Sequence, residues 1–211
     1  LIAVVFVLTA FTLKGTQTFE EITAKRIQMV DSSGKVRVIL AGEFPSPRNH
    51  LAGLIFNNED GSEASGLAYS GKRDKEGKIV AGSILTFDQH QNDQVISLGY
   101  DHMGNQKRLG LSVNDRPDPL SDRVKEAYRA IESAKTPAEA EALRKNYLSR
   151  IPARDIVARR LFAGRDVKGS SLLTLSDPDR KPRLRLQVDK LGKASITFLD
   201  QSGAAIRTIK P

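Results

Sequence analysis

The chain has 211 residues, a net charge of +8 from 33 Lys and Arg against 25 Asp and Glu, and neither cysteine nor tryptophan. This length suits one medium-sized domain with an appendage, and 39% hydrophobic with 27% charged residues is typical of a folded protein. The absence of cysteine excludes disulfides, zinc-thiolate sites, iron–sulfur clusters and thiol nucleophiles. The positive charge indicates an anionic neighbour, whether lipid, nucleic acid or an acidic protein surface.

The chain opens with an apolar run, Leu1–Leu13, which only two threonines interrupt. A membrane-spanning helix needs about 20 apolar residues, so this run fits a signal-peptide core or part of a membrane helix. We predict an uncleaved signal anchor over residues 1–15 whose first turns precede Leu1; a buried strand or helix of the globular core is the alternative. We expect a single-pass protein of the bacterial inner membrane with its soluble domain in the periplasm. The anchor residues are Ile2, Val5, Phe6, Leu8 and Phe11.

A short motif, Asp or Asn followed three residues later by Gly, recurs along the chain. A type I turn favours Asp or Asn at its first position and Gly at its fourth, so each copy predicts a hairpin tip. An EF-hand would need alternating oxygen ligands and a twelfth-position Glu, which no copy supplies, so turn chemistry is favoured over calcium. The copies are Asp31–Gly34, Asn58–Gly61, Asp74–Gly77, Asp101–Gly104 and Asp200–Gly203.

The segments beside these tips alternate apolar and polar residues, as strands do. Residues 26–30 and 36–40 flank the first tip, and residues 194–198 and 205–209 flank the last. A variant tip with Pro is expected at Ser176–Arg180. The spacing is too irregular for a solenoid, so we predict a mainly β fold: an antiparallel hairpin meander, sandwich or open barrel, with a helical insertion and a preceding transmembrane helix.

The long gap between the fourth and fifth copies predicts an insertion. Ser121 or Asp122 is a good N-cap for a first helix, and Thr136–Glu139 is a capping box with Pro at the first helical position of a second. Asp155–Phe162 is interpreted as a third, short helix. The expected organisation is an anchor over 1–15, a β-hairpin domain over 19–114, a helical insert over 118–166, and strands over 167–211 that complete the β-domain.

The positive charge is unevenly distributed. Residues 1–120 hold 13 basic and 14 acidic side chains, residues 121–166 hold 11 and 7, and residues 167–211 hold 9 and 4. Strict alternation over 183–188 places two arginines on one sheet face and Leu184, Leu186 and Val188 on the other. A solvated face with ordinary solubility charges is the alternative to a binding surface. The predicted surface for a partner or an anion comprises Arg150, Arg154, Arg159, Arg160, Arg165, Arg183 and Arg185.

The sequence offers little chemistry. No nucleophile elbow, P-loop or dinucleotide fingerprint is present, and we expect no catalytic residue, no metal and no cofactor. Nucleic-acid binding is disfavoured because aromatic residues are not interleaved with the basic stretches. If neighbouring tips came together, Asp88, His90, Asp93 and His102 could ligate a divalent metal, but exposed loop histidines are the favoured interpretation.

Several segments in the first half of the chain form a recognisable pattern. They are residues 19–22, Arg26, Ile27, residues 30–34, Arg37, residues 71–77, residues 85–89, Asp93, Gln94 and residues 110–117. Through these segments about half of the chain, residues 19–117, resembles a family of uncharacterised bacterial exported or membrane-anchored β-rich proteins. The resemblance implies export and anchoring and no activity, and His90 stands where an aromatic residue is expected.

Three functions follow from these observations. The favoured one is a non-enzymatic, membrane-anchored accessory subunit that docks on a larger membrane protein complex, with a photosynthetic reaction-centre and light-harvesting assembly as one candidate host. Its partners would be the membrane, other subunits of that complex and anionic lipid. The alternatives are an envelope module that binds a glycan or an anionic lipid, and a metal-dependent hydrolase that uses Asp88, His90 and His102.

Overall fold

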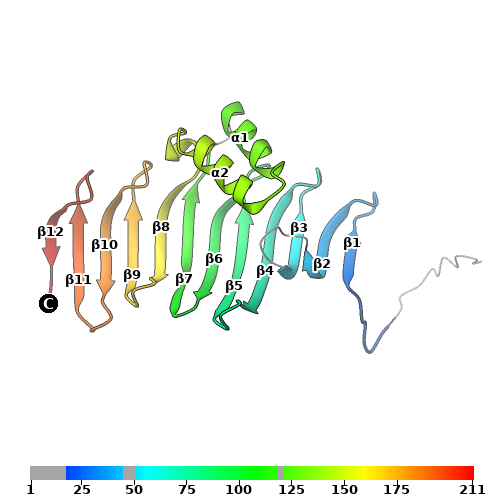
Figure 1. Cartoon of the computed structure of the whole chain (residues 1–211), viewed down its shortest axis with the longest axis horizontal. Coiled ribbons are helices and arrows are strands. Elements are labelled where there is room, and N and C mark those ends of the chain that lie inside the picture. The colour runs from blue at the N-terminus through cyan, green and yellow to red at the C-terminus, as the bar shows by residue number, and fades with distance from the viewer. Residues whose placement is uncertain (1–17, 45–50, 118–120) are drawn as a thin grey trace, which may run out of the picture.

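A computed structural model describes residues 18–44, 51–117 and 121–211 of the chain. Twelve strands form one antiparallel sheet in which every strand pairs with its neighbours in sequence, so the spatial order is β1 to β12. Figure 1 shows the strands side by side in an open sheet, with β1 and β12 at opposite edges. The strands are β1 (Arg26–Val30), β2 (Val36–Phe44), β3 (Leu51–Asn57), β4 (Glu63–Arg73), β5 (Ile79–Asp88), β6 (Gln94–Met103), β7 (Gln106–Asp115), β8 (Ala158–Arg165), β9 (Ser171–Ser176), β10 (Pro182–Val188), β11 (Ala194–Leu199) and β12 (Ala205–Ile209).

The prediction of a mainly β fold of antiparallel hairpins with a helical insertion is confirmed. Of the three arrangements that the sequence left open, the described strands form the meander, as one open sheet (Figure 1). The predicted anchor over residues 1–15, with its five anchor residues, lies outside the described residues. None of the helices in the described part of the chain combines the length and apolar character that crossing a bilayer requires.

Aspartate side chains close many of the hairpins. At Asp31 the backbone carbonyl accepts a bond from Gly34 N (3.0 Å), while the carboxylate accepts bonds from the backbone N–H of Ser33 and Lys35. Asp200 repeats this arrangement with Gly203 N, Ser202 N and Ala204 N. The same carboxylate-to-backbone bonds occur at two turns outside the five predicted copies, Asp166–Gly169 and Asp189–Gly192.

Two sequence interpretations are wrong. Asp101 does not begin a turn, because β6 continues to Met103 and the hairpin closes over two residues, with Gly104 (φ 59°) at the first central position. Glycine is favoured there because the left-handed conformation is costly for other residues. Asp155–Phe162 is not a helix: a 3₁₀ turn ends at Asp155, and residues from Ala158 form β8, so strand structure begins inside the predicted 118–166 insert.

The two predicted helices are present, and both begin at the predicted caps. In α1 (Asp122–Glu132) the Ser121 hydroxyl accepts a bond from Val124 N, and in α2 (Pro137–Leu148) the Thr136 hydroxyl accepts one from Glu139 N. Both helices come between β7 and β8 in the sequence, and Figure 1 shows them at the upper end of the sheet. Val124 and Ala127 of α1 form a buried cluster with Ile151 and Ile156 from the segment that follows α2, and Tyr147 and Leu148 at the end of α2 pack against it.

The sheet itself has very little buried core. Fully or nearly buried apolar side chains in its described strands are few, among them Ala41, Ala158 and Phe162. Glycines let the central strands approach each other closely: a Cβ on Gly164 would lie 2.1 Å from the carbonyl oxygen of Leu109 and 2.6 Å from Cα of Gly110. A side chain at position 164 therefore cannot be added without moving the backbone.

We predict that Gly164→Ala destabilises the protein by about 2 kcal/mol, because the added methyl group would overlap backbone atoms of β7 and force the two strands apart. Gly99→Ala is the matched control, because Gly99 belongs to the same row of paired residues and its Cβ would meet only the Ser83 carbonyl oxygen, at 3.9 Å. Urea unfolding followed by circular dichroism measures both. Equal midpoints for the two variants would contradict the close approach of β7 and β8.

Candidate functional site: an apolar sheet face and an arginine pocket

One face of the sheet carries an uninterrupted row of aliphatic residues, one from each strand. Residues that are direct partners in an antiparallel pair share a face, so the register identifies the row. We call it the aliphatic ladder. Its members are Ile27, Leu40, Leu54, Leu67, Leu85, Leu98, Leu111, Ala163, Leu173, Leu186, Ile196 and Ile209.

A second row runs beside the aliphatic ladder, two residues along each strand, and is also mostly apolar. Together the two rows form what we call the apolar face. The members of the second row are Met29, Val38, Phe56, Ser65, Phe87, Ile96, Val113, Leu161, Leu175, Leu184, Phe198 and Arg207.

No other element of the described chain covers the apolar face completely. Among ladder residues, Leu98 is 55% exposed, Leu67 49% and Leu40 47%, and in the second row Met29 is 52% exposed. Monomeric soluble proteins rarely expose contiguous apolar patches above a few hundred Å². Twelve strands at about 4.8 Å spacing and two rows of side chains give a face of roughly 700 Å².

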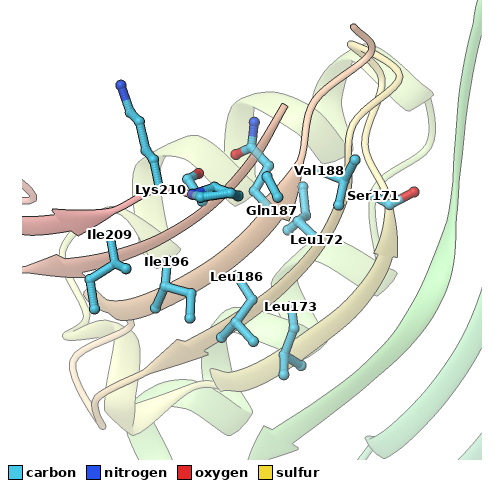
Figure 2. A pocket seen from close by; sticks show the side chains of 12 residues that line it. Ser171, Leu172, Leu173, Leu186, Gln187, Val188, Ile196, Ile209 and Lys210 are labelled. Carbon is cyan, nitrogen blue, oxygen red and sulfur yellow. The ribbon is translucent and has the colours of Figure 1, made fainter. Parts of the chain in front are cut away.

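The apolar face is hollowed toward the C-terminal end. A groove of about 510 Å³ lies over β9 to β12. Figure 2 shows Leu173, Leu186, Ile196 and Ile209, four consecutive ladder residues, in a row along this groove. With such a lining, the groove can bury an apolar group and offers little to hold a polar one in a fixed orientation.

The opposite face is built from smaller and more polar residues. Its central row includes Gly66, Thr86, Ser97, Ser112 and Phe162, which are successive partners from β4 to β8. Arg185 lies on this face, while Leu184 and Leu186 lie on the apolar face, as the alternation over 183–188 predicted.

The structure distributes the seven predicted arginines over different environments. Three of them pair with a carboxylate: Arg154 with Asp179 (3.5 Å), Arg183 with Asp177 (2.6 Å), and Arg160 with Asp115. The Arg165 guanidinium donates to the Lys107 carbonyl, and the Arg150 carbonyl accepts a bond from Arg123. The seven residues therefore differ in their partners, and the surface that they were expected to form stays a prediction.

Arg159 instead belongs to a pocket of about 270 Å³ that the sequence did not indicate. The Phe162 ring has Arg108 Cζ 4.5 Å and Arg159 Cζ 5.7 Å from its centroid. Arg180, which occupies the fourth position of the Asp177 turn with φ 66°, also lines the cavity. We call this cavity the arginine pocket.

The charges in the arginine pocket repel one another. Burial lowers the pKa of Arg159, and the positive charges of Arg108 and Arg180 lower it further. No carboxylate forms an ion pair with these three arginines among the described residues, although Asp166 also lines the cavity. An anion placed between the guanidinium groups would relieve this repulsion.

The proposed metal ligands are not brought together. His90 lies in the tip between β5 and β6, where Nε2 is 3.3 Å from Asp60 Oδ2, while His102 lies near the other end of β6, about 30 Å of strand away. His102 is buried; its Nε2 donates to the Gly104 carbonyl, and its Nδ1 accepts from the Tyr100 hydroxyl. Across the described residues, no group of three His, Asp or Glu has a metal-binding arrangement.

Asp88 and Asp93 do lie near each other, in a charged cluster with Glu63 and Arg116. Arg116 is almost buried and pairs with Asp93 at 2.8 Å. Burial raises the pKa of Asp88, and the charge of Asp93 raises it further. One oxygen of Asp88 is buried without a hydrogen-bond partner. Burial likewise raises the pKa of Glu63, with Asp88 and Asp93 contributing.

Comparison with known proteins adds no relatives. A scan against protein-family models finds no match, and searches of the curated proteins and of the solved structures find none either. The resemblance of residues 19–117 to exported or membrane-anchored proteins therefore stays a prediction.

We predict that Asp88→Asn raises the stability of the protein at pH 7. The native state holds the Asp88 proton more tightly than the unfolded chain does, so this group's contribution is most favourable below its unfolded pKa of about 4 and declines as pH rises through the raised native pKa. Urea midpoints measured from pH 3.5 to pH 7 should show a gain at pH 7 that disappears in acid.

Asp200→Ala is the control, and its effect on stability at pH 7 should be opposite to that of Asp88→Asn. Hydrogen bonds from Ser202 and Ala204 lower the pKa of Asp200, so its contribution is present above the unfolded pKa and is lost as pH falls. Replacing it should reduce stability at pH 7. An Asp88→Asn variant that is less stable than the parent at pH 7 would contradict the assignment of an unfavourable buried carboxylate.

Proposed function

We propose that this protein is a non-enzymatic accessory subunit of a larger membrane protein complex, held at the membrane by its N-terminal segment, and that the apolar face is its docking surface. The observation that carries the proposal is the aliphatic ladder, which extends across all twelve strands and keeps several side chains about half exposed. A surface of this size and composition is typical of an interface that is covered in the working assembly.

The extent of the apolar face favours a protein partner. Its area of roughly 700 Å² approaches the ~800 Å² that each partner buries in a stable interface. Apart from Arg207 and Ser65, its two rows are apolar, which resembles the interior of an obligate interface. The residues that carry the contact are therefore those of the sheet, and the predicted arginine surface has a smaller part in it.

Charge favours a different subunit over a second copy as the occupant. Two copies would bring together two chains of net charge +8 and pay an electrostatic cost that a neutral or acidic partner avoids.

We predict that Leu98→Glu with Leu111→Glu releases the protein from its complex. These residues are paired neighbours on the apolar face and are 55% and 37% exposed, so two charges would be buried on docking at a cost that exceeds their effect on the free sheet. Native mass spectrometry of mildly detergent-extracted membranes should show the parent in a large assembly and the variant as a monomer.

The matched control is Ser97→Glu with Ser112→Glu, because these residues are also paired on β6 and β7 but lie on the opposite face. This control should remain in the assembly. Recovery of the parent chain only as a monomer, or only as a dimer of itself, would overturn the proposal.

A second function, binding of an anionic ligand in the envelope, is favoured by the arginine pocket alone. Three arginines around a cavity of about 270 Å³ suit a phosphate or carboxylate group better than a neutral glycan. Arginine binds such groups through paired N–H donors, and the Phe162 ring holds two of the guanidinium groups in place.

We predict that inorganic phosphate binds the arginine pocket and that Arg159→Gln weakens this binding at least tenfold, as expected for the loss of one charge-assisted contact. Isothermal titration calorimetry measures both affinities. Arg185→Gln removes a charge from the same sheet face outside the pocket and should bind phosphate like the parent. Equal affinities for all three proteins would exclude the pocket as the site.

A further inference from the structure

We propose that the lower end of the sheet in Figure 1, opposite the helices, is a membrane-contact edge that binds the headgroups of anionic lipids. This inference rests on the membrane attachment in the proposed function. In a meander, successive hairpin tips alternate between the two ends of the sheet, so every second turn shares one end. The tips at the lower end follow β4, β6, β8 and β10, and the chain leaves β12 at the same end.

Lysines are concentrated at this lower end. We call them the lysine rim, and all of them are exposed. At about 4.8 Å per strand, the rim extends over roughly 40 Å from β4 to β12. A line of cations of this length suits an extended anionic surface better than a single small ligand. The members of the rim are Lys72, Lys75, Lys78, Lys107, Lys168, Lys190, Lys193 and Lys210.

Three of the carboxylates at this end accept backbone hydrogen bonds within the turns. Asp74 accepts backbone bonds from Glu76 and Lys78, and Asp166 and Asp189 accept the equivalent pairs in their own turns. Backbone N–H groups lower the pKa of Asp189, with smaller contributions from the charges of Lys193 and Lys190. No rim lysine forms a salt bridge within the described parts of the chain.

The upper end has a different balance of charge. Its described hairpin tips contain two lysines, Lys35 and Lys181, and several arginine–carboxylate pairs. These arginine–carboxylate pairs of the upper end have no counterpart among the rim lysines in the described residues. An anionic bilayer attracts basic groups at its surface, and the attraction declines within a Debye length of about 8 Å.

Apolar side chains project from the same lower tips. Leu191, between Lys190 and Lys193, is 72% exposed; Met103, at the end of β6, is 67% exposed; and Val167, beside Lys168, is 49% exposed. Exposed aliphatic groups flanked by lysines match the headgroup region, where ammonium groups meet phosphates and apolar groups reach the acyl boundary. A surface that binds single-stranded nucleic acid would instead present aromatic side chains on which the bases can stack.

The direction of β1 places the attachment at the same end. β1 begins at Arg26, which pairs with Ala41 toward the lower end, so the chain reaches the sheet from that side. Twelve residues, 14–25, separate the apolar run from β1 and can span at most about 40 Å. A chain anchored by that run would therefore hold the lysine rim close to the bilayer.

The absence of cysteine allows a direct test with single-cysteine labels on the full chain. Leu191→Cys and Val167→Cys place an environment-sensitive fluorophore at two lower tips, and Ser202→Cys places it in the upper Asp200 turn. The chain is reconstituted into vesicles of phosphatidylcholine alone or with 30% phosphatidylglycerol. We expect the labels at 191 and 167 to shift to the blue and to be quenched by nitroxide lipids in the anionic vesicles, and the label at 202 to remain in water.

Charge reversal tests the electrostatic attraction between the lysine rim and the anionic vesicles. Lys168→Glu, Lys190→Glu and Lys193→Glu together should reduce the quenched fraction of the 167 label about tenfold, and 0.5 M salt should have the same direction of effect. Lys35→Glu with Lys181→Glu, at the upper end, is the control and should leave that fraction unchanged.

Flotation of the vesicles separates the two proposals. A chain that does not float with either vesicle would overturn the membrane attachment itself. If the chain floats while the labels at 167 and 191 stay in water, the membrane-contact edge is overturned and the membrane attachment is not. The same conclusion holds if the labels enter both kinds of vesicle equally and charge reversal does not change this. Protection of these labels by a single-stranded oligonucleotide instead of anionic vesicles would also overturn it.

Discussion

Continuity of the backbone hydrogen-bond ladder from β1 to β12 is the constraint on which the rest of this structure depends. A sheet without a second layer has no interior, so each aliphatic side chain is shielded mainly by its partners on the two neighbouring strands. The aliphatic ladder provides such partners in every strand, and a shift of one residue anywhere would move the following side chains to the other face. The same arrangement leaves the outer surface of the ladder exposed, and the docking proposal follows from this exposure.

The turns maintain that register at both ends of the sheet. An aspartate that accepts two backbone N–H bonds fixes the chain reversal, as Asp189 does at the lower end and Asp177 at the upper end. Asp177 also pairs with Arg183, whereas the lysines beside Asp74, Asp166 and Asp189 form no salt bridge among the described residues. The hairpin geometry is therefore common to both ends, and the basic residue beside each turn distinguishes them.

Local chemistry allowed much of the fold to be predicted. The caps at Ser121 and Thr136, the turns at Asp31 and Asp200, and the alternation over 183–188 depend on neighbours in sequence. The fourth copy of the turn motif, Asp101–Gly104, does not form the predicted turn, because a glycine such as Gly104 can close a two-residue turn as well as end a longer one. The sequence predicts a helix over Asp155–Phe162, because a short mixed run does not distinguish the helical period from the strand period. Pairing with β7 makes the residues from Ala158 onward a strand. The arginine pocket and the aliphatic ladder could not be predicted without the complete strand register. Arg108, Arg159 and Arg180, for example, are distant in sequence and meet only in the folded sheet.

The helical insertion shows where this architecture can change. It leaves the sheet after β7 and returns at β8, yet Gly110 and Gly164 remain direct partners as if the two strands were joined by a tight turn. An excursion of some forty residues therefore has no effect on the order or the faces of the strands. The upper turns can accept new segments during evolution without disturbing the edge below, so one end of the protein can diversify while the other keeps its geometry.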